Sequence, residues 1–413
     1  MIKLEFPKGF LWGSATSAHQ VEGGNFNDWT EWERKNAERL AKESKNKFTS
    51  PDFIRFPEMS KTENYISGKA CDHYNRFRED FDIAKQLGHN AHRFSIEWSR
   101  IEPEEGKFDE KEIEHYRKVI SALREREIEP FVTLWHWTVP TWFRDKGGWL
   151  CKDAPKYFER YVKKITTSCS NVDFWITLNE PDDIYAFDAY FAHRFPPQHK
   201  SALETWKVLK NLVKAHKNAY KIIHKNNPQA KVGFANNTIC FESKGSIAKI
   251  IKIFANRFWN FWFLKRTLMF NDFIGCNYYY RNILKGFKYN QNENKAVTDT
   301  DTEIHAKGIY YVLRGLKKYN KPIYIMENGL ADAKDEKREK FIKEHLFYVH
   351  KAIQEGVDVC GYFYWSLLDN FEWDKGFWPR FGLVEVDYGD MERKIRSSAF
   401  EYAKICKTNI LEI

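Results

Sequence analysis

The chain has 413 residues, of which 43% are hydrophobic and 17% are aromatic, including 15 Trp, 21 Tyr and 33 Phe. This composition supplies a large core, enough for one α/β barrel or for two ordinary domains. The 66 Lys and Arg exceed the 57 Asp and Glu by nine, but they are spread along the chain rather than clustered. We therefore expect no nucleic-acid partner and only a weak attraction of anions.

The seven cysteines form no CxxC pair, are odd in number, and in several cases lie in apolar runs. This pattern predicts reduced, buried thiols in a reducing compartment. The residues before Phe6 do not resemble a signal peptide. The most apolar segment, 247–263, is interrupted by Lys249, Lys252 and Arg257, which excludes a bilayer-spanning helix. The sequence thus predicts a cytoplasmic protein without stable membrane insertion.

Eight apolar runs of strand length recur along the chain, and most are separated by room for a helix. They lie at 10–16, 91–97, 129–135, 174–180, 231–237, 273–279, 322–327 and 359–367. Between them, the ranges 109–125, 155–168, 202–226, 302–319 and 336–355 carry apolar residues at the spacing of one helix face. Alternating strands and helices predict a parallel sheet, and eight units close it into a (β/α)8 TIM barrel of the α/β class.

No linker or repeat divides the chain, so residues 1–413 are predicted to form a single barrel domain. The longest irregular stretch, 36–69, follows the first strand and holds Pro51 and Pro57. We expect a long loop over the barrel mouth or a helical insertion there. A TIM barrel carries its active site at the carboxyl ends of its strands, so residues at those ends are the candidates for function.

Two of the predicted strands end in a glutamate. The run 174–180 ends at Glu180, where Pro181 forbids extension because it lacks a backbone donor. The run 322–327 ends at Glu327, and Gly329 supplies a turn. Either carboxylate alone could belong to a structural ion pair. Two carboxylates at the same rim are, however, what the cleavage of a glycosidic bond requires. The abundant aromatic side chains also suit stacking on sugar rings.

Six motifs in chain order carry a resemblance to one family. They are FLWGSATSAHQ at 10–20, RFSIEWSR at 93–100, TLNEP at 177–181, NYY at 277–279, ENG at 327–329 and WSLLDNFEW at 365–373. With these motifs the sequence resembles the family 1 glycoside hydrolases, the β-glucosidase and β-galactosidase family, over nearly its whole length. His19, Thr138 and Asp182 depart from the family pattern, and these departures bear on aglycone choice or packing more than on the chemistry.

The resemblance implies that Glu180 is the general acid/base and that Glu327 is the nucleophile. Arg93 and Tyr279 are candidates to keep Glu327 ionised, through an opposite charge and through a hydrogen bond to the charged form. The resemblance also implies a set of sugar-binding residues and two residues on the side of the leaving group. The sugar-binding set is Gln20, His136, Asn179, Asn277, Trp365, Glu372 and Trp373, and the leaving-group residues are Trp137 and Trp142.

The expected activity is that of a retaining exo-β-glycosidase, which releases terminal β-linked sugars of the glucose or galactose type through a covalent glycosyl-enzyme ester. A transglycosidase would use the same ester, whereas a non-catalytic sugar- or lipid-binding barrel would typically have lost one carboxylate. The expected partner is a small carbohydrate or glycoside, without a cofactor or a metal. Sugar preference, aglycone, chain length, oligomeric state and thermal stability stay open.

Two further features carry expectations of their own. Glu97 also ends a strand, but beside Arg100 it is expected to make a structural ion pair rather than to react. The aromatic segment 256–263 is interpreted as part of a barrel helix with a buried face. The alternative is a hydrophobic rim that accepts an aglycone or touches a membrane surface.

Overall fold

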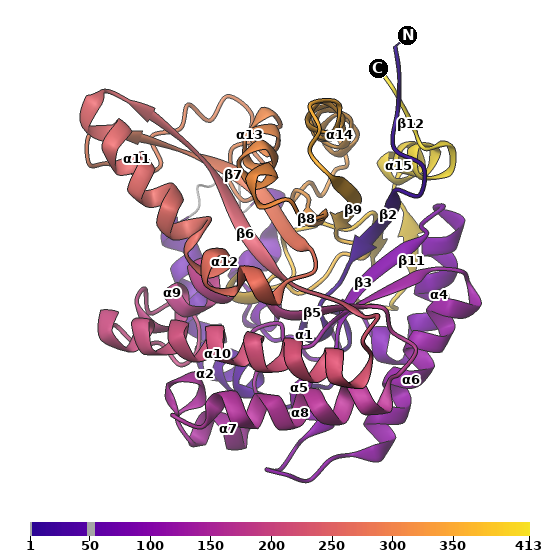
Figure 1. Ribbon diagram of the computed structural model, residues 1–413, viewed down its shortest axis with the longest axis vertical. Helices are drawn as coiled ribbons and strands as arrows, with labels where there is room; N and C mark the ends of the chain where they lie inside the picture. Colours follow the sequence, from indigo (N-terminus) through magenta and orange to yellow (C-terminus); the bar gives the residue numbers. More distant parts are fainter. Residues whose placement is uncertain (1, 48–53) are drawn as a thin grey trace.

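The computed structural model describes residues 2–47 and 54–413. Eight parallel strands close into a barrel in the order of the chain, with helices around it (Figure 1). The strands are β2 (Leu11–Ala15), β3 (Ala91–Ser95), β4 (Glu129–Thr133), β5 (Phe174–Asn179), β6 (Lys231–Lys244), β7 (Ile274–Lys285), β8 (Ile323–Asn328) and β9 (Val359–Trp365). Each predicted strand range overlaps one of these strands, so the predicted TIM barrel is confirmed.

β6 and β7 are longer than predicted. They remain paired as far as Lys244 and Lys285, and together they project beyond the rest of the barrel (Figure 1). The sequence-based prediction ended them at 237 and 279, where the apolar runs stop. Paired strands form backbone hydrogen bonds with each other whatever their side chains are. The pairing of β6 with β7 therefore continues through polar residues such as Arg281 and Glu242.

Side chains from nearly every strand fill the inside of the barrel. Phe131, Ile176 and Met326 are among those that are fully buried there. Phe131 stacks on Phe174 with ring centroids 4.1 Å apart. A second, larger core lies between the strands and the helices, because successive side chains of a strand point to opposite faces. The barrel interior is therefore packed, and the chemistry must lie at its rim.

Helices cover the outside of the barrel. The predicted helical ranges are confirmed as α6 (Glu110–Glu125), α8 (Ala154–Ser168), α10 (Ala202–Asn226), α13 (Lys307–Leu316), which continues as η6 (Lys317–Tyr319), and α14 (Arg338–Gln354). The further α-helices of the described residues are α1 (Ala18–Val21), α2 (Asp28–Lys47), α4 (His73–Gln86), α5 (Trp98–Ile101), α7 (Thr141–Asp145), α9 (Phe187–Tyr190), α11 (Ser246–Trp259), α12 (Trp262–Thr267) and α15 (Ser397–Thr408).

The stretch 36–69 contains helical structure. The second half of α2 lies in it, followed by the 3-10 turns η1 (Pro57–Ser60) and η2 (Thr62–Tyr65), while 48–53 lie outside the described residues. Asn64 ties this stretch to the loop after β9. Its side chain donates to the carbonyl of Lys375 over 3.0 Å and accepts from the amide of Phe377 over 3.0 Å. The stretch thereby supports a loop that carries predicted site residues.

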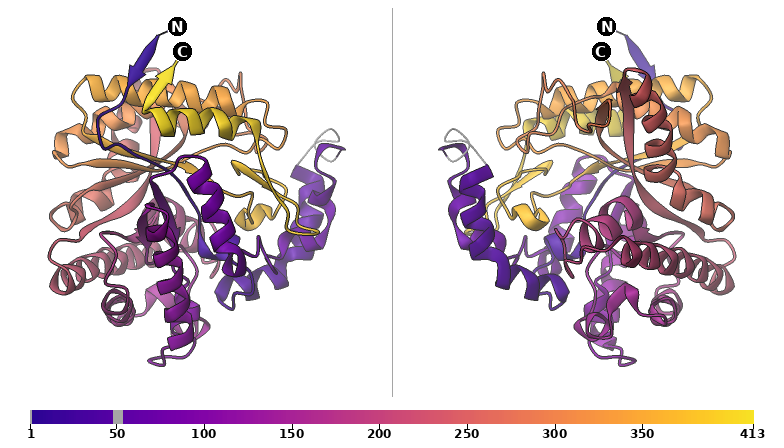
Figure 2. Two further views of the ribbon diagram at one scale, coloured as in Figure 1. Left: turned by 90° about the vertical axis from the view of Figure 1, so that its right-hand side faces the viewer. Right: turned by 90° about the vertical axis from the view of Figure 1, so that its left-hand side faces the viewer.

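The two ends of the described chain lie side by side (Figure 2). β1 (Lys3–Glu5) pairs antiparallel with β12 (Ile410–Glu412), and a second small ribbon joins β10 (Val384–Val386) to β11 (Arg393–Ile395). None of the helices in the described ranges is long and apolar enough to cross a bilayer.

Candidate active site

A cavity of about 350 Å³ opens where the barrel strands end. Its wall is built by residues at the carboxyl ends of the strands and by the loops that follow them. Among the predicted site residues, the wall includes Gln20, His136, Trp137, Asn179, Glu180, Tyr279, Glu327, Trp365, Glu372 and Trp373. Residues that are far apart in the sequence therefore meet at one cavity, as a parallel barrel requires.

Glu327 lies at the end of β8 and is held by two strong hydrogen bonds. Arg93 Nη1 donates to its Oε1 over 2.5 Å, and the Tyr279 hydroxyl donates to its Oε2 over 2.7 Å. Burial and the charge of Glu327 raise the pKa of Tyr279 well above its ordinary value, so the phenol keeps its proton and donates. Each oxygen of Glu327 therefore accepts one hydrogen bond from a buried donor.

The approach of β8 to β9 beside Glu327 requires a glycine. A Cβ on Gly329 would lie 1.8 Å from the carbonyl oxygen of Trp365. Only a residue without a side chain fits there. The ENG motif thus joins Glu327 to the backbone geometry that brings Trp365 next to it.

Glu180 follows β5 and has the opposite environment. Burial, and next the negative charge of Glu327, raise the pKa of Glu180 well above its ordinary value. Its backbone lies in the left-handed region at φ 43°, which is unusual for a residue with a side chain. Asn277 Nδ2 donates to Glu180 Oε1 over 2.8 Å and fixes the orientation of the carboxyl group.

One chain of hydrogen bonds joins the two carboxyl groups. Arg93, besides contacting Glu327, donates through Nη2 to Asn179 Oδ1 over 2.7 Å. The same oxygen accepts from Asn277 Nδ2 over 3.3 Å, and Asn277 in turn contacts Glu180. Arg93 is also held by Thr133, whose hydroxyl accepts from Nε over 3.0 Å. The relative position of the two carboxyl groups is therefore set by buried, mutually bonded side chains.

His136 and Gln20 each have one polar side-chain atom that makes no hydrogen bond to the described residues. Asn179 Nδ2 donates to His136 Nε2 over 3.0 Å, which leaves the proton of the neutral ring on Nδ1. Burial and the charge of Arg93 lower the pKa of His136 well below its ordinary value, so the ring stays neutral. His136 Nδ1 and Gln20 Oε1 are buried without a hydrogen-bond partner. One is a donor and the other an acceptor, as a pair of sugar hydroxyls would need.

Glu372 and two tryptophans complete the wall opposite the carboxyl pair. Gln20 Nε2 donates to Glu372 Oε2 over 3.3 Å. Burial raises the pKa of Glu372 to about 7. Trp373 packs against Trp137 with centroids 4.6 Å apart, and Trp365 lies 6.1 Å from the His136 ring. This part of the cavity offers a carboxyl group and flat aromatic side chains on the same wall, a combination that suits a sugar ring.

Two predicted site residues lie away from the cavity wall. Trp142 belongs to α7, where its indole donates to the carbonyl of Glu102 over 2.8 Å and its ring packs on Tyr157. The turn at Pro140 starts α7 and carries this side chain away from the rim. Asn277 is fully buried behind Glu180 and Asn179, so it holds the carboxyl pair instead of forming the wall.

The expected ion pair of Glu97 is wrong. Its carboxylate accepts from the hydroxyls of Ser99 and Thr138, both over 2.8 Å. Arg100 pairs instead with Glu22 over 2.9 Å. Glu97 begins α5 and holds the loop after β4, which is a structural role. Thr138, one of the departures from the family pattern, is its partner.

The cavity wall also includes residues that the sequence analysis did not single out. Thr298, Thr300 and Thr302 alternate with aspartates in the loop before α13, and all three line the cavity. They lie in a turn that is closed by the antiparallel bridge between Val297 and Glu303, and the spacing of the threonines alone does not predict that turn. Across the mouth, Arg194 pairs with Asp188 over 2.9 Å and with Asp374 over 3.3 Å, joining the loops after β5 and β9.

A further group of metal-binding side chain types lies outside this cavity. Atoms of Cys240, Glu242 and His305 come within 4.8 Å of one another. The guanidinium of Arg281, however, already donates to Glu242 over 3.2 Å. Its positive charge neutralises the carboxylate and repels a cation. We therefore assign no metal to this group.

A TIM barrel with two carboxyl groups on one cavity at its strand ends, one bound by Arg93 and Tyr279 and the other with a raised pKa, has the arrangement of a glycoside hydrolase. The family model "Glycosyl hydrolase family 1" matches residues 2–269 and 263–411. The chain belongs to glycosyl hydrolase family 1.

Similar proteins match over their full lengths. The chain is 33% identical to beta-glucosidase A of Thermotoga maritima, with 99% of each chain covered. It is 32% identical to a 1,4-beta-D-glucan glucohydrolase of Thermotoga neapolitana, with 98% of this chain and 99% of the relative covered. Among solved structures, a beta-glycosidase from Pyrococcus horikoshii has a TM-score of 0.88 at 37% identity, covering 100% of this chain and 97% of that one.

Proposed function

We propose that the protein is a retaining exo-β-glycosidase that acts on terminal β-linked sugars of the glucose or galactose type. The observation that carries the proposal is the contrast between the two carboxyl groups on one cavity. Glu327 is bound by Arg93 and Tyr279, whereas burial and the charge of Glu327 raise the pKa of Glu180. A nucleophile must be ionised and an acid must carry a proton, so the two environments fit the two roles.

In the first step, Glu327 attacks the anomeric carbon and the bond from this carbon to the leaving oxygen breaks. Glu180 gives its proton to that oxygen, so the aglycone departs as an alcohol and the sugar stays as an ester of Glu327. The ester carries no charge. The carboxyl group of Glu180 then loses the negative neighbour that raised its pKa, and it becomes a base.

In the second step, Glu180 takes a proton from a water molecule, and the resulting oxygen attacks the anomeric carbon. The ester bond breaks and Glu327 returns to its carboxylate form. Two inversions at the same carbon give net retention. A transglycosidase would differ only in the acceptor, an alcohol in place of water, and product analysis with an added alcohol distinguishes the two activities.

The sugar is proposed to bind between Trp365 and the polar groups of Gln20, His136 and Glu372. The names of the relatives support glucose, and Glu372 favours unphosphorylated sugars because its charge would repel a phosphate. The apolar side chains of Trp137, Ile184 and Phe195 also line the cavity and are proposed to contact the aglycone. We further propose a cytoplasmic location, which the seven unpaired cysteines among the described residues support.

Azide and two variants test the assignment of the carboxyl groups. In Glu327→Gly, azide can attack an activated aryl β-glucoside from the side of the missing nucleophile, and a single inversion gives the α-glucosyl azide. In Glu180→Ala, the ester still forms from an activated glucoside, and azide then displaces it from the other side. The expected product is the β-glucosyl azide, identified by NMR.

Glu97→Ala serves as the matched control, because Glu97 is a buried carboxylate at a strand end whose oxygens accept hydrogen bonds from Ser99 and Thr138. It should yield no glucosyl azide of either anomer. The proposal is wrong if both Glu327→Gly and Glu180→Ala give the same anomer, or if Glu97→Ala gives the α-azide.

A further inference from the structure

Helix α11 turns its large apolar side chains toward solvent. Ile250, Ile253 and Phe254 are 59%, 64% and 67% exposed. The only residues of this helix that are buried are the small Ala248 and Ala255. A surface helix of a globular protein normally directs its large apolar face at the core. The orientation of α11 is the reverse, so its outer face is left uncovered.

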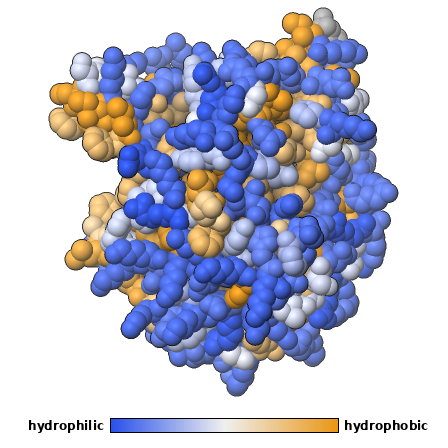
Figure 3. Space-filling model, viewed as in Figure 1, coloured by the Kyte–Doolittle hydropathy of each residue, from blue (hydrophilic) through white to orange (hydrophobic). Residues whose placement is uncertain are grey.

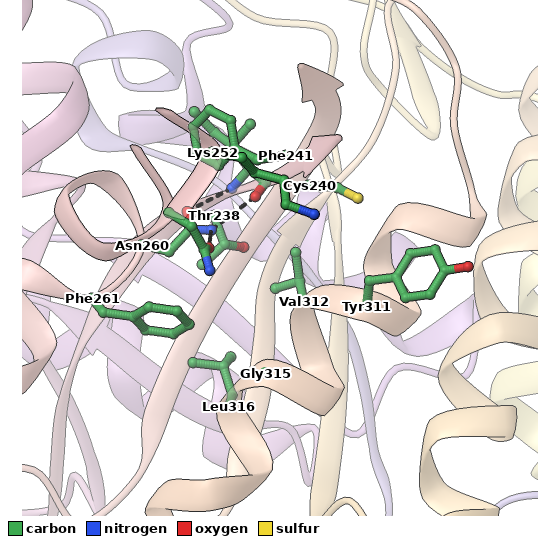
Figure 4. Close-up of a pocket in the computed structure, with 12 residues that line it drawn as sticks. Thr238, Cys240, Phe241, Lys252, Asn260, Phe261, Tyr311, Val312, Gly315 and Leu316 are labelled. Carbon is green, nitrogen blue, oxygen red and sulfur yellow. Dashed lines mark hydrogen bonds between the residues drawn. The ribbon is translucent and has the colours of Figure 1, made fainter. Parts of the chain in front are cut away.

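The inner face of α11 borders a cavity instead of a packed core (Figure 4). This cavity, of about 150 Å³, lies between β6, α11 and α13. From the helix side it is lined by the polar residues Lys252 and Asn256. Just beyond the helix end, Asn260 exchanges hydrogen bonds with the backbone of Ile239 at 2.9 Å and 2.8 Å. Polar contacts therefore help to anchor this region, and the exposed side chains of Ile250, Ile253 and Phe254 take little part in the attachment.

The uncovered area continues past the helix. β6 and β7 remain paired up to Lys244 and Lys285, so the segment after β7 lies next to the start of α11. In that segment Phe287 is 78% exposed. A contiguous apolar area covers the projecting end of the molecule where α11 lies (Figure 3). Contiguous exposed apolar areas mark interaction surfaces, whereas single exposed apolar residues do not.

Within residues 244–271 the charges are of one sign, although Lys244 pairs with Glu293 over 3.1 Å. Residues 244–271 include six basic residues and no Asp or Glu; the basic residues are Lys244, Lys249, Lys252, Arg257, Lys265 and Arg266. Two copies of such a face would repel each other, so self-association is disfavoured. An apolar helix face flanked by lysine and arginine complements a surface that is negatively charged outside and apolar beneath.

We propose that α11 and the adjoining end of the β6–β7 pair dock on an anionic lipid bilayer. The apolar side chains of α11 enter the boundary between headgroups and acyl chains, and the exposed basic residues Lys249 and Arg257 contact the anionic headgroups. The helix lies on the bilayer and does not cross it, in agreement with its length of 14 residues. The proposal does not depend on the catalytic activity.

Sedimentation with vesicles tests the proposal on the full-length protein. The wild type should pellet with extruded vesicles of phosphatidylcholine and phosphatidylglycerol, and much less with phosphatidylcholine alone. Ile253→Ser combined with Phe254→Ser should weaken the binding at least about tenfold. Lys249→Glu combined with Arg257→Glu should also weaken it, and added salt should weaken the wild type.

Phe400→Ser is the matched control, since Phe400 is 47% exposed on α15, outside this area, and it should bind as the wild type does. All variants should keep the melting temperature and the hydrolysis of a soluble aryl glucoside. Equal binding of the wild type and the Ile253/Phe254 variant, or no preference for anionic vesicles, overturns the proposal. A third outcome also overturns the proposal. In it, the wild type binds no vesicles and forms a dimer in analytical ultracentrifugation, and the Ile253/Phe254 variant does not form that dimer.

Discussion

At the scale of single residues, the site contains backbone conformations that side chains disfavour. Glu180, Trp137 and Trp373 have φ values of 43°, 76° and 49°, in the left-handed region. Such positions typically cost ~1–3 kcal/mol each and persist only where the surroundings hold them. Here the hydrogen bond from Trp137 Nε1 to the carbonyl of Asn179, at 3.1 Å, and the network behind Glu180 hold them. The strain serves to aim side chains into the cavity.

The buried amide of Asn277 should tune the acidity of Glu180. Its hydrogen bond to Glu180 favours the charged form, so Asn277→Ala should raise the pKa of Glu180 further. The proposed acid then keeps its proton to higher pH, and the basic limb of the kcat/KM profile shifts upward. Full pH profiles on an aryl β-glucoside measure the shift.

Asn236→Ala provides the control for this shift. Asn236 is also a buried asparagine on a barrel strand, but it donates to the carbonyl of Asn260 and contacts neither carboxyl group. Its replacement should lower stability and leave the basic limb in place. A basic limb of Asn277→Ala at or below the wild-type position would contradict the role assigned to this amide.

Glu372 should cost stability at neutral pH in exchange for sugar binding. Burial raises its pKa from 4.5 to about 7. The folded state therefore binds the proton more tightly than the unfolded chain does. This tighter proton binding stabilises the folded state fully below pH 4.5, and the stabilisation is lost as the pH rises through about 7. Relative to the wild type, Glu372→Gln should gain roughly 1–3 kcal/mol of unfolding free energy between pH 4.5 and pH 8.

Urea unfolding of both proteins at the two pH values measures this difference. Replacing Glu372 should lower the activity. Glu372→Ala should lower kcat/KM for aryl glucosides at least ~10²-fold, because charge-assisted bonds to the sugar strengthen in the transition state. A loss below about threefold would mean that Glu372 does not contact the sugar. An unchanged stability difference between the two pH values would contradict the role of burial.

From the sequence, the residues that meet at the cavity could be predicted better than the directions of individual side chains. Glu180 and Glu327 could be found because a strand end in a parallel barrel fixes where a side chain lies. Arg93 was predicted beside Glu327, and the structure has this contact at 2.5 Å. Asn277 and Trp142 were misplaced because one-residue differences in a loop or strand decide which way a side chain points, and spacing alone does not fix that.

At the scale of elements, strand existence was predictable and strand length was not. The apolar runs marked all eight strands, but β6 and β7 continue beyond the predicted ends through a mixture of polar and apolar residues. Their pairing depends on the neighbouring strand, which a single run does not contain. The aromatic segment 256–263 divides in a similar way. Phe261 and Phe263 are buried as expected, while Phe258 belongs to the exposed face of α11.

Helix α6 should depend on its capping aspartate. Asp109 Oδ1 accepts from the amides of Lys111 and Glu112, over 2.8 Å and 3.3 Å. Asp109→Ala leaves both amides without this acceptor and should lower the unfolding free energy by about 1 kcal/mol. Asp153→Ala is the control, because Asp153 precedes α8 without a side-chain cap. In thermal unfolding, Asp109→Ala should have a lower melting temperature than Asp153→Ala. Equal melting temperatures would contradict the assigned cap.

At the scale of the whole molecule, the candidate site draws on almost every part of the barrel. Arg93, Glu180 and Glu327 come from β3, the end of β5 and β8. His136 and Tyr279 add β4 and β7, and the loop after β9 closes the cavity with the help of the stretch 54–65. The interior core below the site is shared by the same strands. A ligand in the cavity therefore contacts residues that are together only when the barrel is closed.

A glucose-like iminosugar should consequently stabilise the protein as a single unit. A ligand that binds only the folded state at about 100 times its Kd adds ~2.7 kcal/mol. With ~2.1 cal/mol/K of unfolding entropy per residue, this corresponds to a rise in Tm of about 3 °C for a chain of this length. Scanning calorimetry at several ligand concentrations measures it. Glu372→Ala should lose most of the rise, because the sugar loses its charged contact. If the trace separated into two transitions and the ligand moved only one, the barrel would not unfold as one cooperative structure around its site.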